Sequence, residues 1–300
     1  MSLFIGCSYS TLHIFTDFSE RFSLFPYDSE ESVTTSDLQT ISTTVSHTKA
    51  AAIVETRRLD NLLPIILHFS ALLGPEWPIH IFTSEANIDI FLNSAAFQRE
   101  VSVGRFHLRA LPVEVTLDSH ASVSRFFTKP WLWEAMEPSE KVLLFQADSI
   151  ICSGAPETAD SFLEWDFIGA PIDSGRNLGV GFNGGLSIRN RALMLDIVTN
   201  HSWEQERHGD HQHGNVDYED QWFYQKLKEL PAMENGTAAA RLPSEDTARA
   251  FAVETIWHPN PFGFHQANIW QPGHMDDIMN YCPEYGLSTA KTFTNHDTEG

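Results

Sequence analysis

The sequence predicts an α/β fold with a mostly parallel central sheet flanked by helices. From residue 50 onward, short apolar or β-branched runs alternate with longer stretches of helical spacing, which is typical of parallel strands joined by helices. The run 141–151, KVLLFQADSII, is the most apolar of these, as expected for a strand covered on both faces. A hydrophobic content of 42% in 300 residues is enough to fill the core of such a fold.

The first half of the chain shows the alternation clearly. We expect strands at residues 51–56, 78–84, 104–113 and 141–151, and helices at 59–74, 86–100 and 119–137. The first helix has Pro64 in its first turns and ends at Gly74, a common stop signal. The third is expected to be helical on either side of Pro130, with Pro138 beyond its end.

The second half is less regular. We expect a strand, glycine turn, strand and helix over 162–172 and 181–200, a helix at 218–230 and a last strand-like run at 248–257. The residues after Pro272 show no clear periodicity. The predicted organisation is an N-terminal arm at 1–48, one domain at 49–272, and an irregular tail at 273–300.

The composition narrows the class of protein. The net charge of −21 disfavours nucleic acid or an anionic membrane as a partner, because both require clustered Lys and Arg. No stretch has the roughly 18 apolar residues of a membrane span. The three cysteines are far apart and odd in number, which suits neither a disulfide framework nor a Cys-x-x-Cys metal site. We therefore expect a cytoplasmic protein without a membrane span.

Parallel sheets bind ligands beyond the carboxyl ends of their strands. Glu55, Arg57, Thr83 and Asp148 fall at such ends. Asp148 has two interpretations, a turn-capping residue before Ser149, or a ligand for a divalent cation or a sugar hydroxyl.

The stretch GVGFNGGLSIRN contains Asn183, Gly184 and Gly185. Glycines permit a close approach to the backbone, so a ligand could rest against these residues. The alternative is a tight hairpin with Asn-Gly-Gly as its turn.

Two further motifs carry groups suited to catalysis. Glu219 and Asp220 open a predicted helix, where acids complement the helix dipole, but one of the two carboxylates could instead face a cleft as a general base. His265, between aromatic residues, is either a packed and hydrogen-bonded side chain or a metal ligand.

In this order, the stretches FQADS, GFNGGLSI, YEDQ and FGFHQ resemble the landmarks of the GT-A-fold glycosyltransferases: the DxD strand end, the Gly-rich loop, the xED motif and a C-terminal His. The stretches VETR, FQADS, DFIGAP, NGGLSIRN and ED are most similar to an uncharacterised, mostly fungal family of GT-A-like domains. The resemblance covers roughly residues 50 to 270. It implies a GT-A-like fold for nucleotide-diphospho-sugar transfer.

The resemblance also implies roles for individual residues. Glu55, Thr56 and Arg57 would line the nucleotide pocket, with Gln146 beside them on the donor. Asp148 and His265 would bind Mn²⁺ or Mg²⁺. Asn183, Gly184 and Gly185 would face the donor sugar or the acceptor, and Asp220, next to Glu219, would be the base of an inverting reaction.

Two departures weaken this picture. Gln146 replaces the first acid of a DxD motif, so the site has one charge fewer for holding a metal, which puts the metal in doubt. Few cations are available for a diphosphate: Arg57, Arg58, Lys129 and Arg189.

Three functions remain open. The first is transfer of a sugar from a nucleotide diphosphate to a hydroxyl. The second is a metal-independent cyclisation or cycloaddition, of the Diels-Alderase type, on an apolar metabolite in natural-product (secondary) metabolism, with the reactive conformer held in an aromatic-lined cleft. The third is a non-catalytic binding module. In each case the partner is a small molecule.

Overall fold

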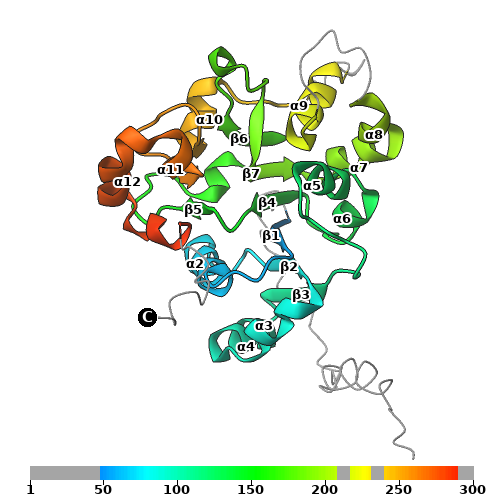
Figure 1. Ribbon diagram of the computed structural model, residues 1–300, viewed down its shortest axis with the longest axis vertical. Helices are drawn as coiled ribbons and strands as arrows, with labels where there is room; N and C mark the ends of the chain where they lie inside the picture. Colours follow the sequence, from blue (N-terminus) through cyan, green and yellow to red (C-terminus); the bar gives the residue numbers. More distant parts are fainter. Residues whose placement is uncertain (1–47, 208–216, 231–239, 290–300) are drawn as a thin grey trace, which may run out of the picture. The chain divides into compact units, whose positions relative to one another are not determined.

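The computed structural model describes residues 48–207, 217–230 and 240–289 (Figure 1). Nearly all of the predicted arm, residues 1–47, lies outside this part of the chain, as do the last residues of the predicted tail. Within the described residues, no helix combines the length and the apolar character needed to cross a membrane.

A six-stranded sheet with the order β3-β2-β1-β4-β7-β6 forms the centre of the fold (Figure 1). Its strands are β1 (Lys49–Glu55), β2 (Ile79–Thr83), β3 (Phe106–Ala110), β4 (Lys141–Phe145), β6 (Phe167–Pro171) and β7 (Phe182–Asn190). β1 to β4 run parallel, and β7 is antiparallel to both of its neighbours. The predicted mostly parallel α/β sheet is therefore confirmed.

Alternate residues of each central strand face opposite layers of helices. Ala51 and Leu143 belong to the core that includes α2, whereas Ala52 and Leu144 belong to the core that includes α5, α6, α7 and α9. Helices are thus seen on both faces of the sheet in Figure 1. This two-sided burial explains the nearly continuous apolar character of β1 and β4. The α-helices are α2 (Leu62–Leu73), α3 (Ile88–Leu92), α4 (Ala95–Ser102), α5 (His120–Phe127), α6 (Pro130–Glu134), α7 (Arg191–Asn200), α8 (Trp203–Glu206), α9 (Glu219–Glu229), α10 (Glu245–Phe251), α11 (Ala267–Trp270) and α12 (Met275–Tyr281).

A second, three-stranded sheet has the order β5-β9-β8, with β5 (Ser149–Ile151), β8 (Ala252–Val253) and β9 (Gly263–His265). β5 begins four residues after the end of β4 and pairs antiparallel with β9, so that Ser149 lies opposite His265. This small sheet therefore brings the end of the FQADS motif next to the FGFHQ motif.

Four predictions of local structure are wrong. The single helix at 86–100 is two helices, because the side chain of Ser94 caps a new start at α4. The Asn-Gly-Gly turn does not form, since these residues lie within β7, where the pairing with β6 shifts register. The strand-like run at 248–257 begins in α10, which Ser244 caps, and only Ala252 and Val253 form a strand, β8. The stretch expected to be irregular contains α12 and a 3-10 helix at Pro283–Leu287, which bury Ile278 and Tyr285 against β5 and β9.

The expectation about cysteines is also wrong. Cys152, directly after β5, forms a disulfide with Cys282, directly after α12. Whether two cysteines can form a disulfide depends on their distance in space and not on their separation in the sequence, which is 130 residues here. The reasoning that placed the chain in a reducing compartment loses its premise, because disulfides are typical of oxidising compartments.

Candidate active site

The carboxyl end of β4 and the start of β7 bring four predicted residues side by side. The backbone N–H of Gln146 donates to the carbonyl of Gly185 at 2.9 Å, which continues the β4–β7 ladder past the end of β4. Asn183 and Gly184 precede Gly185 on β7. The chain then turns at Ala147, whose carbonyl accepts a hydrogen bond from the Asn61 side chain, and presents Asp148.

A cavity of about 440 Å³ opens beside these residues. Its lining combines residues from β7, α9, β9 and the segments that follow β4, β8 and β9. The polar members are His120, Ser124, Gln146, Asn183, Gly184, Gly185, Glu219, Asp220, Gln221, Glu254, Thr255, His265 and Gln266, and the others are Val123, Ile172, Leu178, Tyr218, Ile269 and Trp270. The fold therefore brings most of the predicted site residues to one cavity. Asp148 is not among the lining residues but contacts His265 and Gln266, which are.

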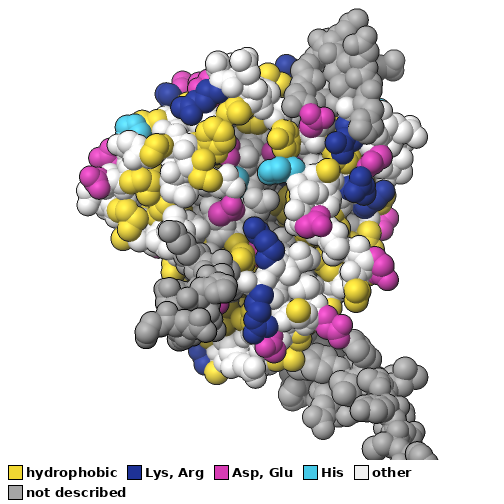
Figure 2. Space-filling view, in the orientation of Figure 1, with side chains coloured by type: hydrophobic (Ala, Val, Ile, Leu, Met, Phe, Trp, Pro, Cys, Tyr) yellow, Lys and Arg dark blue, Asp and Glu magenta, His cyan; other side chains and the backbone are white. Residues whose placement is uncertain are grey.

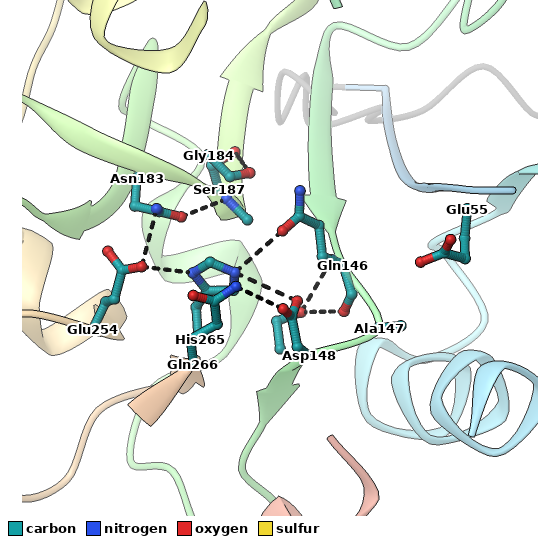
Figure 3. Close-up of polar contacts among 12 residues, drawn as sticks. Glu55, Gln146, Ala147, Asp148, Asn183, Gly184, Ser187, Glu254, His265 and Gln266 are labelled. Carbon is teal, nitrogen blue, oxygen red and sulfur yellow. Dashed lines mark hydrogen bonds and ion pairs between the residues drawn. The ribbon is translucent and has the colours of Figure 1, made fainter. Parts of the chain in front are cut away.

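His265 is the centre of a polar cluster that connects both sides of this site (Figure 3). Its Nδ1 lies 3.1 Å from Glu254 Oε1, and its Nε2 lies 3.2 Å from Gln146 Oε1 and 3.5 Å from Asp148 Oδ1. Burial alone opposes the charged form of the ring. The hydrogen bonds and charges of Asp148 and Glu254 outweigh it and raise the pKa of His265 to about 10. The imidazole is thus a buried cation between two carboxylates.

Asp148 is held by the segment around β9. Burial opposes ionisation, but His265 and the Gln266 amide, which donates to Oδ2 at 2.7 Å, hold the pKa of Asp148 well below its usual range. Gln266 has a φ of 45°, which is uncommon outside glycine. In this conformation its backbone N–H also donates to the Asp148 carbonyl at 3.2 Å. Asp148 is therefore a permanently ionised, oriented carboxylate, and not only a turn cap.

The glycines of β7 are needed because protein side chains fill the space beside them. A Cβ on Gly185 would lie 2.3 Å from His265 Nε2, and one on Gly184 would lie 2.3 Å from an Nη atom of Arg189. Asn183 completes the strand by accepting from the Gly185 N–H at 2.7 Å and donating to Glu254 at 3.1 Å. The sequence predicts that a ligand rests against this motif, whereas the groups that approach Gly184 and Gly185 in the structure are the side chains of Arg189 and His265.

Glu219 and Asp220 open α9, and both are nearly buried at the cavity. Glu219 pairs with Arg189, a fully buried guanidinium, at 3.2 Å. Arg189 lies among four aromatic rings, those of Phe127, Trp133, Phe167 and Phe223. It is therefore not available to a diphosphate, contrary to the prediction from the sequence.

Asp220 has no cation of its own. Its Oδ2 accepts from the N–H of Gly184 at 2.8 Å and its Oδ1 from the N–H of Gln221 at 2.7 Å. Burial, followed by the charge of Glu219, raises the pKa of Asp220 to about 7 despite these hydrogen bonds and the charge of Arg189. The two adjacent acids thus have different tasks: Glu219 neutralises Arg189, and Asp220 is able to exchange a proton near neutral pH.

The third group of predicted residues lies apart from the cluster, as Glu55 does in Figure 3. The buried Glu55 binds the guanidinium of Arg57 through both carboxylate oxygens, at 3.0 and 2.7 Å. The carbonyl of Thr56 accepts from the Ser84 hydroxyl at 2.9 Å, which fixes the turn after β1. The exposed side of Arg57 interacts with the charge of Asp148, so this arginine lies toward the Asp148 end of the site.

The residues around His265 Nε2 include oxygen and nitrogen atoms of the kinds that divalent cations bind. Two ligands of one ion, each at about 2.1 Å, lie about 3 Å apart when their bonds are perpendicular. The separations of Nε2 from Gln146 Oε1 and Asp148 Oδ1 are close to this value. Glu254 on Nδ1 corresponds to the carboxylate that commonly orients a ligating histidine. Even so, in the described part of the chain no three His, Cys, Asp or Glu residues form a metal site, and an ion would have to displace a proton from His265.

Sequence reasoning missed Glu254, Gln221 and Gln266. Glu254 follows the end of β8 directly, so the strand-end rule that selected Asp148 would have selected it as well. The mistaken reading of 248–257 as one strand hid that end. Nothing in the sequence distinguishes Gln221 and Gln266 from surface glutamines.

The match to known protein families covers most of this site. A family described as protein of unknown function (DUF5672) matches residues 105–265, more than half of the chain, and the chain belongs to this family. The match includes Asp148, Asp220 and His265, and excludes Glu55 to Arg57. No curated protein matches the chain.

Among solved structures, the chain is similar to the apo form of the glycosyltransferase GlyE from Streptococcus pneumoniae TIGR4, with 15% identity and a TM-score of 0.43, over 73% of this chain and 54% of GlyE. It is also similar to the mannosyltransferase PcManGT from Pyrobaculum calidifontis, solved with GDP-Man and Mn²⁺, with 11% identity and a TM-score of 0.39, over 66% of this chain and 55% of that one. The chain thus spans about half the length of these two proteins. At these identities and TM-scores, function has to be argued from the site itself.

Proposed function

We propose that the protein is a GT-A-type glycosyltransferase-like enzyme, which transfers a sugar from a nucleoside diphosphate donor to a hydroxyl acceptor. The observation that carries this proposal is the presence, at one cavity, of a buried carboxylate with a raised pKa and a separate cluster of His265 with Asp148. Transfer of this kind needs a base for the acceptor hydroxyl and positive charge near the leaving diphosphate. Asp220 meets the first requirement, and the second would be met by a metal ion held at Asp148 and His265 together with Arg57.

The base is Asp220. The acceptor oxygen attacks the anomeric carbon, its proton passes to the Asp220 carboxylate, and the bond between the sugar and the diphosphate breaks. A pKa of about 7 suits this task, because a base is most effective when its pKa lies near the working pH. The N–H groups of Gly184 and Gln221 hold the carboxylate in place during the step.

The donor lies toward Asp148 and the turn after β1. Glu55 occupies Nε and Nη2 of Arg57, so Nη1 of this exposed side chain is the group that would meet a phosphate. Thr56 holds the turn in position through Ser84. Mn²⁺ or Mg²⁺, held by Asp148 and His265 with the Gln146 amide oxygen beside them, would stabilise the charge of the departing diphosphate. Because Gln146 is neutral, we expect weak metal affinity.

Calorimetric titration with a panel of nucleoside diphosphate sugars, with and without Mn²⁺, tests the proposal. We expect metal-dependent binding of at least one donor, and its loss in Asp148→Ala and His265→Ala. Asp246→Ala is the matched control, because this acid is 81% exposed, pairs only with Arg249 and lies outside the cavity. If no donor binds under any of these conditions, sugar transfer is excluded.

Asp220→Asn tests the base separately. Turnover should fall by about 10²-fold or more, the usual contribution of a general base, while donor affinity stays within about twofold. Unchanged turnover would contradict the role of Asp220.

One observation favours a second function. Among the described residues that line the cavity there is no Lys or Arg, and six lining side chains are apolar or aromatic. A cavity of this kind also suits a metal-independent cyclisation or cycloaddition of an apolar metabolite, held in a reactive conformer. Tight binding of an apolar metabolite together with the absence of donor binding would favour this alternative, and binding without turnover would favour a non-catalytic module.

A further inference from the structure

The charged groups that the structure describes at the cavity carry more negative than positive charge. Glu219 is paired with Arg189, but Glu254 and Asp148 share the single imidazole of His265. Among the described residues Asp220 is paired with no cation, and no lining Lys or Arg is left to receive an anion. A negatively charged substrate group entering this cavity would lose its hydration and approach Asp220 without gaining a partner.

Two buried polar atoms of the lining lack a partner within the described part of the chain. They are Oε1 of Gln221, a residue that is 3% exposed, and Nε1 of Trp270. The amide nitrogen of Gln221 is fixed by its hydrogen bond to the Leu178 carbonyl at 2.9 Å, so Oε1 is the free acceptor. The indole N–H of Trp270 is a free donor. Both atoms are covered by protein and are not exposed at the cavity surface, so we assign them no contact with an acceptor.

The cavity also has an apolar side. Ile269 is 60% exposed and Tyr218 is 37% exposed, although both are large apolar or aromatic side chains that line the cavity. The ring of Tyr218 packs edge-on against His120 at 5.5 Å, which holds it in place. In Figure 2, hydrophobic side chains border histidine atoms near the centre of the face shown. Apolar surface of this kind next to oriented polar groups is typical of small-molecule sites.

We propose that this cavity is an acceptor site for an uncharged or cationic hydroxyl compound that carries an apolar group. The hydroxyl faces Asp220, and the apolar group rests on Ile269 and Tyr218. The diphosphate of the donor stays outside the cavity, toward Asp148 and Arg57. This inference rests on the proposed sugar transfer and names the chemistry of its acceptor.

Three probes separate the contributions: phenyl β-D-glucoside, phenyl β-D-glucuronide and glucose. The glucuronide has a carboxylate in place of the C6 hydroxymethyl group of the glucoside, and glucose lacks the apolar group. Calorimetric titration of the full chain should show phenyl glucoside binding about tenfold or more tightly than either of the others. Equal or tighter binding of the glucuronide, or no binding of any probe, would overturn the proposal.

Ile269→Ser tests the apolar side without risk to the core. It should reduce phenyl glucoside binding to the level of glucose, whereas Val103→Ser, at a 67% exposed position outside the cavity, should not change it. Equal affinities in the two variants would exclude the role of Ile269. Failure of this acceptor proposal can be distinguished from failure of sugar transfer. A protein that binds nucleotide sugars but also binds the glucuronide contradicts only the acceptor chemistry. A protein that prefers the glucoside but binds no donor contradicts sugar transfer.

Discussion

Asp220 and Glu219 are adjacent buried carboxylates, and replacing each by its amide should have opposite effects on stability. The pKa of Asp220 rises from 3.8 to about 7 on folding. Between these values the folded state holds a proton that the unfolded state has lost, so the stability of the wild type falls as the pH rises from about 4 to 7. Asp220→Asn has no proton to lose and escapes this fall.

The size of the effect follows from the shift. One pKa unit corresponds to about 1.4 kcal/mol. Relative to acidic pH, the raised pKa of Asp220 therefore lowers the free energy of unfolding by on the order of 4 kcal/mol at pH 8 and by roughly 1.5 kcal/mol at pH 5. The stability of Asp220→Asn relative to the wild type should therefore increase by about 2–3 kcal/mol from pH 5 to pH 8. The difference between the two pH values cancels any fixed cost of placing the Asn amide against the N–H groups of Gly184 and Gln221.

Urea unfolding at pH 5 and pH 8, followed by tryptophan fluorescence, measures both free energies. Glu219→Gln is the matched control: it leaves the buried Arg189 without its anion and should destabilise the protein by about 3–5 kcal/mol at pH 8. The reasoning fails if the advantage of Asp220→Asn does not grow with pH, or if Glu219→Gln costs less than Asp220→Asn at pH 8.

Three further outcomes are expected. Gly185→Ala should destabilise the protein by about 1–3 kcal/mol and weaken metal-dependent donor binding, because the new Cβ meets the His265 ring. Gly286→Ala, with no atom within 4 Å of its Cβ, should unfold like the wild type in a thermal melt. Arg189→Met should cost about 3–5 kcal/mol in urea unfolding, most of it recovered in Arg189→Met/Glu219→Gln; equal losses in the single and double variants would contradict the pairing. Reducing the Cys152–Cys282 disulfide should cost about 2–5 kcal/mol, and reductant should leave the melt of Cys152→Ala/Cys282→Ala unchanged; a wild type that melts alike in both buffers would argue against the bond.

The sequence predicted the sheet well because the signal for a parallel strand is local. The apolar runs of β1 and β4 are buried on both faces, and the rule that ligands gather at strand ends selected Asp148, which the fold brings to His265. The contacts that give these residues their properties are not local. The positive charge of His265 depends on Glu254, and the proton affinity of Asp220 depends on Arg189 being taken up by Glu219.

The mistakes have a common physical origin. Ser94 caps a new helix inside the stretch predicted as one helix, and Ser244, just before the run predicted as a strand, caps α10. The Asn-Gly-Gly stretch matches a hairpin turn by its residue types, but it lies within β7, where Asn183 pairs with β6 and the Gly185 carbonyl accepts from the Gln146 N–H. The pairing of Cys152 with Cys282 depends on the docking of α12, for which the sequence after Pro272 gives no periodic signal.

The small sheet has a practical consequence for where the chain can be shortened. Sequence periodicity places the end of the domain near residue 272, yet the segment beyond it supplies Cys282, and Tyr285 there donates to the Asn268 side chain at 3.1 Å. β5, which follows Asp148, and β9, which ends in His265, both pack against that segment. A fragment that stops at 272 would lose the segment that packs against β5 and β9, which carry Asp148 and His265 at their ends. Inactivity of such a fragment would therefore reflect this lost packing and not the chemistry of the cavity.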